Sequence, residues 1–217
     1  MRHNILISGA SSGLGAQMAR EFAARGRNLA LCARRSERLE QLRDELTAAH
    51  PDITIAIRTM DVTEPDQVFD GVGSLATELG TLDRVIVNAG IGKGQPIGTG
   101  HLVIVSSLLA FRGVPRNATT YAATKAAVAS LAEGLRAETR ATKALRDIKI
   151  TTLFPGYIQS EMNPDRTPLV SKTEPAVRTM ISAMEREVGT AMVPPWPWAI
   201  AGTLMKVLPL SLVARFF

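Results

Sequence analysis

The chain has 217 residues, of which 46% are hydrophobic, 21% are charged and one is a cysteine. Apolar content near one half excludes wholesale disorder, and a mean hydropathy of +0.09 is too low for a polytopic membrane protein. The lone Cys32 excludes an internal disulfide and a cysteine-rich metal cluster, which favours a reducing compartment. The net charge of +5 is spread along the chain without a lysine-rich run. We therefore expect a globular cytoplasmic protein without a metal site or a nucleic-acid partner.

Short apolar runs alternate along the chain with longer segments of helical periodicity. In order, the sequence predicts the strand 4–7, the helix 13–25, the strand 29–33, the helix 36–49, a third strand from 53 to near 61, a helix from 63 to 79, the strands 84–87 and 102–105, a helix from 121 to about 143, the strand 148–154, a helix around 177–188 and a short strand at 191–193. This alternation predicts an α/β fold, a doubly wound (Rossmann-type) parallel sheet with helices on both faces. We expect one such domain over residues 1–195, followed by an apolar tail at 196–217.

One connection breaks this alternation. Residues 90–100, between the fourth and fifth predicted strands, contain five glycines and a proline, so a crossover helix is missing between residues 90 and 101. Either the protein lacks the helix, or residues are absent from the sequence between Gly100 and His101. The second explanation is favoured, because without the helix one sheet face would expose apolar side chains. A normal peptide bond between Gly100 and His101 would exclude it.

A glycine-rich turn follows the first predicted strand and precedes a helix. Such a turn lets backbone N–H groups and the helix N-terminus face a diphosphate with no Cβ in the way. A plain tight turn is the alternative, but the position after a buried strand favours nucleotide binding. The residues assigned to this site are Gly9, Ser11, Ser12, Gly13, Leu14 and Gly15.

The end of the second predicted strand bears on the choice of cofactor. An acidic residue here would accept a hydrogen bond from a ribose 2′-hydroxyl, whereas Arg34 and Arg35 suit a 2′-phosphate. NADP(H) is therefore favoured over NAD(H), with a solvated charge pair as the alternative. Asp61 and Val62, after the third strand, are also assigned to the cofactor. Asp61 either caps the following turn or accepts a hydrogen bond from the adenine amine.

Tyr121 and Lys125 are four residues apart on one predicted helix, which places the phenol and the ammonium on one face. A lysine one turn away and an oxidised nicotinamide ring both favour the phenolate, so the phenol could exchange protons near neutral pH. Ser106 and Ser107 follow the fifth predicted strand, where open α/β sheets place their ligands. A serine hydroxyl there can donate to a substrate carbonyl oxygen. The alternative for Ser107 is a role in a turn or a helix cap.

Together these motifs resemble the compact branch of the short-chain dehydrogenase/reductase family, from residue 4 to about 195. The likeness rests on the glycine turn, on Asn88-Ala89-Gly90, on Ser107 with Tyr121 and Lys125, and on Pro155-Gly156. It implies an NADP(H)-dependent interconversion of a carbonyl and an alcohol. Tyr121 would be the general acid/base, Ser107 would orient the carbonyl, and Lys125 would bind the nicotinamide ribose.

The same resemblance implies further cofactor contacts and an oligomer. The residues concerned are Asn88, Ala89, Gly90, Tyr121, Lys125, Pro155, Gly156, Ile158 and Ser160. In the family, the crossover helix carries a catalytic asparagine and much of the subunit interface. Residues 91–100 contain no asparagine. The alternative function is therefore a catalytically impaired nucleotide-binding scaffold.

The apolar tail leaves three interpretations open. It could cap the site, form a subunit contact in a homodimer or homotetramer, or lie on a membrane surface, in decreasing order of preference. The first would imply a lipophilic carbonyl or alcohol as the substrate.

Overall fold

The structure is a computed structural model that describes residues 2–88, 100–113, 118–159 and 170–213. In chain order its elements are β1 (Asn4–Ser8), α1 (Gly13–Ala23), β2 (Asn28–Ala33), α2 (Ser36–Ala49), β3 (Ile55–Thr59), α3 (Pro65–Leu79), β4 (Arg84–Val87), β5 (Gly100–Val105), the 3-10 helix η1 (Leu108–Phe111), α4 (Thr119–Ala141), the 3-10 helix η3 (Lys143–Leu145), β6 (Ile148–Pro155), α5 (Thr173–Glu185), β7 (Thr190–Val193), α6 (Pro195–Val207) and α7 (Leu210–Val213). The predicted strands and helices are found with boundaries shifted by a few residues, and the tail, for which no element was predicted, forms α6 and α7.

The seven strands form one parallel sheet in the order β3-β2-β1-β4-β5-β6-β7. This arrangement confirms the predicted Rossmann-type fold. The strand order reverses between β1 and β4, and open α/β sheets bind their ligands at such a switch point, beyond the carboxyl ends of the strands. By its internal contacts the chain divides into two compact units, Met1–Val103 with Asp147–Lys149, and Ile104–Arg146 with Ile150–Phe217.

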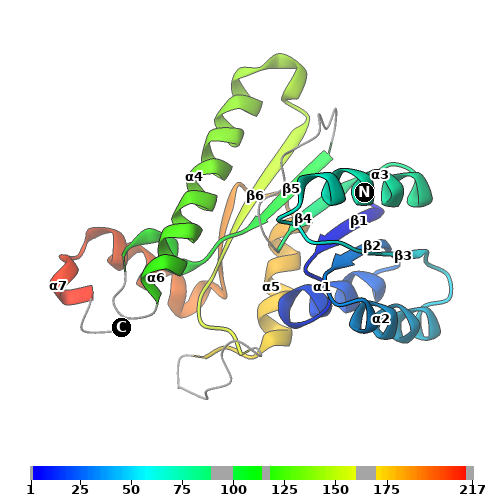
Figure 1. Cartoon of the computed structure of the whole chain (residues 1–217). Helices are drawn as coiled ribbons and strands as arrows, with labels where there is room; N and C mark the ends of the chain where they lie inside the picture. The colour runs from blue at the N-terminus through cyan, green and yellow to red at the C-terminus, as the bar shows by residue number, and fades with distance from the viewer. Residues whose placement is uncertain (1, 89–99, 114–117, 160–169, 214–217) are drawn as a thin grey trace. The chain divides into compact units, whose positions relative to one another are not determined.

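In the first unit, α1 and α2 lie on one face of β1, β2 and β3, and α3 covers the other (Figure 1). Strands β1 and β2 are apolar at nearly every position because both of their faces are buried. Leu6 and Ala30 belong to the core cluster under α3, where Leu75 is fully buried. Their neighbours Ile5 and Leu29, also fully buried, point to the opposite face by strand alternation.

Residues 88–99 connect β4 to β5 in this sequence, and β5 begins at Gly100. The N–H of His101 donates to the Asp83 carbonyl at 3.1 Å. The expectation that residues are absent from the sequence between Gly100 and His101 stays a prediction. Within β4, Arg84 and Ile86 are buried, and Val85 and Val87 are partly buried.

A buried polar pair ties β4 to β5 at the start of both strands. Arg84 and His101 are each 1% exposed, and the Arg84 Nε donates to the His101 Nδ1 at 3.0 Å. Because a guanidinium has only donors, that ring nitrogen must be unprotonated. The Arg84 guanidinium also lies 5.7 Å from the centroid of the Phe22 ring.

In the second unit, α4 runs along β6, and α6 contacts β7 and η1 (Figure 1). One core cluster joins these elements, made of Leu108, Ala122, Trp198, Met205 and Val213. The tail therefore buries one side within this unit. Its other side stays outside this cluster, with Trp196 75% exposed and Val207 71% exposed. None of the helices in the described parts is long and apolar enough to cross a membrane.

Candidate active site

The glycine turn is shaped so that α1 begins directly against its backbone. Gly9 and Gly13 have φ values of +67° and +54°, a left-handed conformation that favours glycine. A Cβ on Gly15 would lie 2.2 Å from the Gly9 carbonyl oxygen. Ser12 makes no side-chain capping bond, and the first turn of α1, which contains Leu14, holds no acidic residue. The N-terminus of α1 thus keeps its positive end for an anionic ligand such as a diphosphate.

Asn88 braces this turn from the end of β4. Its N–H donates to the Ser8 Oγ at 3.1 Å, and its Nδ2 donates to the Gly9 carbonyl at 3.4 Å. Asn88 was predicted to line the adenosine side of the cofactor, and the structure shows a bracing role for its side chain. Ser8 was not predicted as a site residue. It could have been, because a polar residue at the end of a buried apolar strand needs a hydrogen-bond partner. Ala89 and Gly90, predicted with Asn88, lie outside the described residues.

The two arginines after β2 have different neighbours. Arg35 reaches the glycine turn, where its Nε donates to the Ser11 Oγ at 3.3 Å and its Nη2 to the Ser12 Oγ at 2.5 Å. Arg34 is exposed and lies close enough to Asp61 for its charge to act on that carboxylate. The structure therefore joins Arg35, Ser11 and Ser12 into one polar group beside the start of α1.

Asp61 has the turn-capping role that was one of its two predicted alternatives. Its Oδ1 accepts hydrogen bonds from the Thr63 N–H at 3.0 Å and from the Thr63 Oγ1 at 2.9 Å. These two bonds, with the charge of Arg34, hold the pKa of Asp61 below its usual value. Val62, between Asp61 and Thr63 in the sequence, is partly exposed. The other alternative, a contact with adenine, stays a prediction.

Ser107 ends the loop after β5 and caps the 3-10 helix η1. It is 7% exposed, and its Oγ accepts a hydrogen bond from the Leu109 N–H at 3.2 Å. The predicted capping alternative is thus present. A hydroxyl that accepts one bond still has its own hydrogen to donate. The capping bond therefore fixes the oxygen of Ser107 and leaves the donor role open.

Tyr121 and Lys125 share one side of α4, near the end of β5. The Lys125 Nζ lies 5.7 Å from the centroid of the Tyr121 ring and donates to the Val105 carbonyl at 3.0 Å. The Ser106 Oγ donates to the Lys125 carbonyl at 2.8 Å. The side chain of Lys125 is therefore bonded to the last residue of β5, and its backbone to the residue that follows β5. Burial lowers the pKa of Lys125. Tyr121 is 39% exposed, which leaves its ring accessible.

The Pro155-Gly156 motif ends β6 beside the tail. The Gly156 N–H donates to the Val193 carbonyl at 2.9 Å, and a Cβ on Gly156 would lie 2.3 Å from the indole of Trp198. Glycine is therefore required here by the close approach of an aromatic ring. Ile158 is 3% exposed and forms a parallel bridge with Ser171. Ser160, predicted as a phosphate contact, lies outside the described residues.

Two aromatic side chains of this region were missed from the sequence. Tyr157 and Trp198 pack with ring centroids 5.7 Å apart. Burial raises the pKa of Tyr157, and the charge of Tyr121 adds to the effect, so the two phenols are within electrostatic range of each other. The Trp198 Nε1 is buried with no hydrogen-bond partner among the described residues. Tyr157 could have been found from the sequence, because it directly follows Pro155-Gly156. Trp198 could not, because the sequence of the tail does not show where the tail packs.

No group of three or more His, Cys, Asp or Glu side chains that could hold a metal ion occurs in the described ranges. Burial raises the pKa of the Cys32 thiol to about 12. The thiolate is the reactive form of cysteine, so this side chain is chemically inert at neutral pH.

The strand order, the switch point and the glycine turn define a Rossmann-type nucleotide-binding fold. A profile of the family described as short chain dehydrogenase matches residues 3–99 and 96–169. An uncharacterized oxidoreductase of Mycobacterium tuberculosis (strain ATCC 25618 / H37Rv) is 46% identical over 250 residues, which cover 99% of this chain and 97% of the relative. The chain therefore belongs to the short-chain dehydrogenase/reductase family, as the resemblance predicted, and it is an oxidoreductase of that family.

Two further proteins extend the comparison. The 11-beta-hydroxysteroid dehydrogenase 1A of Arabidopsis thaliana is 32% identical over 191 residues, covering 73% of this chain and 53% of the relative. The solved structure of a short-chain dehydrogenase from Sphingobium yanoikuyae in complex with NADPH superposes with a TM-score of 0.74. It is 24% identical in sequence, and the match covers 99% of this chain and 100% of that one. This likeness supports the fold.

The comparisons also bear on the missing helix. The alignment with the mycobacterial relative spans 250 positions, whereas the whole chain has 217 residues, so at least 33 positions hold no residue of this chain. The family profile matches in two pieces that meet at residues 96–99, inside the link from β4 to β5. Both findings agree with a crossover that is shorter than in the relative.

Lys125→Met is expected to change how stability depends on pH. Because the pKa of Lys125 is lowered below the ordinary 10.5, the unfolded chain binds more protons than the folded chain in the window between the lowered value and 10.5. The free energy of unfolding of the wild type should therefore rise, relative to the variant, as the pH increases through that window. At pH values below that window the ammonium is charged in both states, and the burial penalty is fully present.

Urea unfolding of both proteins, from neutral pH to about pH 10.5, measures this difference. The matched control is Lys143→Met, which removes an exposed lysine of the same unit and should show no comparable drift. If the free energy of unfolding of the wild type, relative to that of Lys125→Met, stayed constant or fell with increasing pH, the assignment of a half-buried ammonium would be contradicted.

Proposed function

We propose that the protein uses NADP(H) to interconvert a carbonyl and an alcohol on a lipophilic substrate. The observation that carries the proposal is the position of Lys125, which lies beside the Tyr121 ring and is bonded to Val105 and to Ser106, the residue before Ser107. Family membership supplies the class of reaction, and these three side chains supply the groups that such a reaction needs.

The proton steps follow from the chemistry of the three side chains. In the direction of reduction, the Tyr121 hydroxyl gives its proton to the substrate oxygen as that oxygen becomes an alcohol. The Ser107 hydroxyl donates a hydrogen bond to the same oxygen and holds it in place. The Lys125 ammonium stabilises the phenolate left behind, because an opposite charge nearby favours the ionised form. When bound, the dinucleotide supplies the hydride.

The first unit offers features that fit a dinucleotide. The start of α1 is uncapped and faces the turn, and the required glycine at position 15 lets helix and turn approach closely. We assign the diphosphate to Gly9, the Ser11–Gly15 segment and the α1 N-terminus, and the 2′-phosphate to Arg35 with the hydroxyls of Ser11 and Ser12. Arg34, whose charge acts on Asp61, has the secondary role.

Arg35→Gln should weaken NADPH binding by roughly 10- to 100-fold and leave NADH binding nearly unchanged. The reason is that a hydrogen bond to a charged group contributes about 1.5–3 kcal/mol, and only NADPH carries the 2′-phosphate. Fluorescence titration with both cofactors measures the effect. Arg34→Gln is the matched control and should change NADPH affinity less. Equal losses for the two cofactors in Arg35→Gln would remove the phosphate from this site.

A lipophilic substrate is supported by the aromatic surroundings of Ser107. Tyr157, Trp198, Leu109 and Phe111 all belong to the cluster around Leu108, the residue next to Ser107. A relative that is 32% identical bears the name of a hydroxysteroid dehydrogenase, which names an apolar substrate for that protein. We infer a bulky apolar ketone, aldehyde or alcohol for this chain.

A nucleotide-binding scaffold without activity is the second candidate. The shortened link from β4 to β5 favours it, since the family's catalytic asparagine belongs to the helix that this link replaces. Both candidates bind NADPH, and only the enzyme oxidises it when a panel of apolar carbonyls is added. NADPH consumption with at least one carbonyl supports the enzyme. Tight NADPH binding with no consumption across the panel supports the scaffold.

A further inference from the structure

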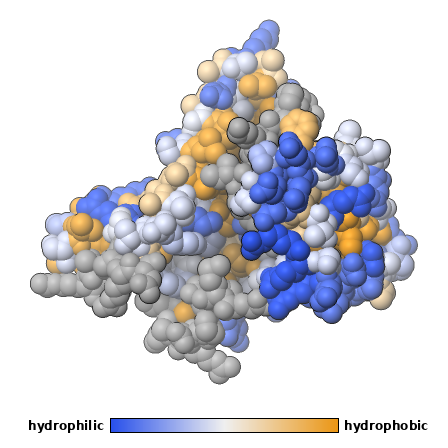
Figure 2. Space-filling view, viewed as in Figure 1, coloured by the Kyte–Doolittle hydropathy of each residue, from blue (hydrophilic) through white to orange (hydrophobic). Residues whose placement is uncertain are grey.

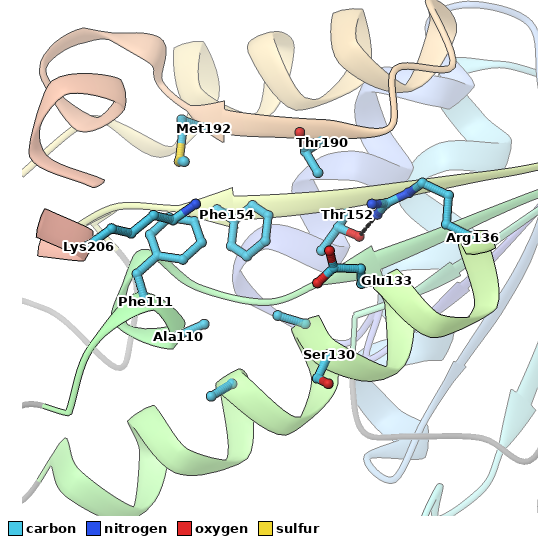
Figure 3. Close-up of a pocket in the computed structure, with 12 residues that line it drawn as sticks. Ala110, Phe111, Ser130, Glu133, Arg136, Thr152, Phe154, Thr190, Met192 and Lys206 are labelled. Atoms are coloured by element: carbon cyan, nitrogen blue, oxygen red, sulfur yellow. Dashed lines mark hydrogen bonds between the residues drawn. The ribbon is translucent and has the colours of Figure 1, made fainter. Parts of the chain in front are cut away.

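A second pocket lies within the second unit, apart from Ser107, Tyr121 and Lys125. It has a volume of about 420 Å³ and opens between α4, η1, β6, β7 and α6 (Figure 3). Binding sites for small organic molecules have volumes of about 300–1,000 Å³, so this pocket is large enough for a small ligand. None of the three proposed catalytic side chains lines it.

The pocket exists because α4 carries small side chains where it faces β6. Ala126 and Ala129 line it, whereas larger residues at these positions would fill the space toward Phe154. At 3.6 residues per turn, Ala126 lies about 100° around the helix from Lys125, and Ala129 lies one turn beyond Lys125. The pocket therefore adjoins the face of α4 that carries Tyr121 and Lys125, one turn further along the helix. Figure 2 shows further apolar surface along α4, where Leu131 is 44% exposed.

One end of the pocket combines aromatic rings with a cation. The rings of Phe111 and Phe154 pack with centroids 4.6 Å apart, and the Lys206 Nζ lies 4.0 Å from the centroid of Phe111. Met192 lies across the opening from them (Figure 3). Lys206 forms no ion pair with a carboxylate of the described residues, so its ammonium has only the ring as a partner there. An apolar surface thus meets a positive charge that has no counter-ion among the residues that the structure describes.

The other end is polar and already partly satisfied. The Arg136 Nη2 donates to the Thr152 Oγ1 at 2.6 Å, and its Nε donates to the Ile150 carbonyl at 3.4 Å. Glu133, one turn earlier on α4, lies beside this arginine in the pocket (Figure 3). The lining therefore carries two cations and one carboxylate, an excess of one positive charge. Lys206 is at the aromatic end, and the carboxylate of Glu133 is at the opposite end.

We propose that this pocket binds an amphiphilic monocarboxylate, with its carboxylate on Lys206 and its apolar chain on Phe111, Phe154 and Met192. A single negative charge balances the excess positive charge of the lining. Glu133 repels a second negative charge at the far end, which selects against dicarboxylates. The apolar chain gains the burial that the aromatic wall offers, because removing CH₂ groups from water is favourable.

Calorimetric titration of the full chain with decanoate tests the proposal. We expect saturable binding of one decanoate per chain. Lys206→Met should weaken it by roughly tenfold or more, because a charge-assisted hydrogen bond contributes about 1.5–3 kcal/mol. Lys172→Met, an exposed lysine of the same unit, is the matched control and should bind like the wild type. Decanol, which has the same chain without the charge, should bind more weakly than decanoate.

A second variant fills the space instead of removing the charge. Ala129→Leu should abolish decanoate binding while the thermal unfolding curve shows a folded protein. Sebacate, a dicarboxylate of the same chain length, should bind more weakly than decanoate. Unchanged decanoate affinity in Lys206→Met would overturn the proposal, as would the absence of binding to the wild type. Loss of decanoate binding in Tyr121→Phe would also overturn it, because it would place the ligand at the catalytic side chains.

Discussion

Tyr121→Phe is expected to lower the rate of NADPH-dependent carbonyl reduction by about 10²–10⁴-fold and to leave NADPH binding intact. The substitution removes one oxygen and keeps the ring that lies 5.7 Å from the Lys125 Nζ. Without the hydroxyl, the developing alkoxide has no positioned proton donor, although Ser107 still offers a hydrogen bond. Initial rates at saturating NADPH, together with fluorescence titration, separate the chemical step from cofactor binding.

Tyr157→Phe provides the matched control for this experiment. It removes a phenolic oxygen from a ring that packs on Trp198, within electrostatic range of Tyr121. Because Lys125 does not pair with this phenol in the proposal, the rate should change by less than about tenfold. A Tyr121→Phe protein with full turnover would remove Tyr121 from the proton transfer. A larger loss in Tyr157→Phe than in Tyr121→Phe would move the acid/base role to Tyr157.

Gly15→Ala is expected to weaken NADPH binding by about tenfold or more and to destabilise the first unit. The added Cβ would lie 2.2 Å from the Gly9 carbonyl oxygen, which is backbone and cannot move aside as a flexible side chain could. Overpacking of this kind costs about 1–3 kcal/mol, and about 1.4 kcal/mol corresponds to tenfold in affinity. The strain falls on the turn and on the first turn of α1, which are the parts assigned to the diphosphate.

Gly73→Ala is the control, since it adds the same methyl group in α3 with no atom within 4 Å apart from the adjacent residues and the backbone of the helix itself. In a helix interior this change stabilises by up to about 1 kcal/mol, and NADPH affinity should not change. Chemical unfolding and fluorescence titration of both variants measure the two effects. If Gly15→Ala bound NADPH as tightly as the wild type, the close approach of helix and turn would have no part in cofactor binding.

Patterns that act over a few residues predicted most of the fold. The buried runs that became β1 and β2 are apolar at consecutive positions because helices cover both faces, and this pattern is visible without coordinates. The glycines of the turn could be assigned because Gly9 and Gly13 take positive φ values, which other residues avoid. Periodicity likewise predicted the helix that carries Tyr121, to within two residues of its observed start.

Contacts between distant parts of the chain could not be predicted in this way. Nothing in the spacing of the tail shows that Trp198 packs on Gly156, because that approach depends on the tertiary path of α6. The different surroundings of Arg34 and Arg35 likewise depend on where β2 ends relative to the glycine turn. The pocket behind α4 needs five elements in place, so no single stretch of sequence could reveal it.

The link from β4 to β5 is a feature that local patterns leave open. Its glycines predict that no crossover helix forms, and an uncovered apolar face predicts that residues are absent from the sequence between Gly100 and His101. The second expectation stays a prediction. Strand β4 alternates, with Arg84 and Ile86 buried and Val85 and Val87 only partly so.

The most direct test of hydride transfer is the fate of deuterium from NADPH labelled at C4 of the nicotinamide ring. The two C4 epimers are incubated separately with the protein and an apolar ketone from the carbonyl panel, and the alcohol is analysed by mass spectrometry. We predict that one epimer alone places one deuterium on the carbinol carbon, and that Tyr121→Phe slows its appearance. Alcohol without deuterium from either epimer, or no alcohol with any carbonyl that the wild type is offered, would contradict the account.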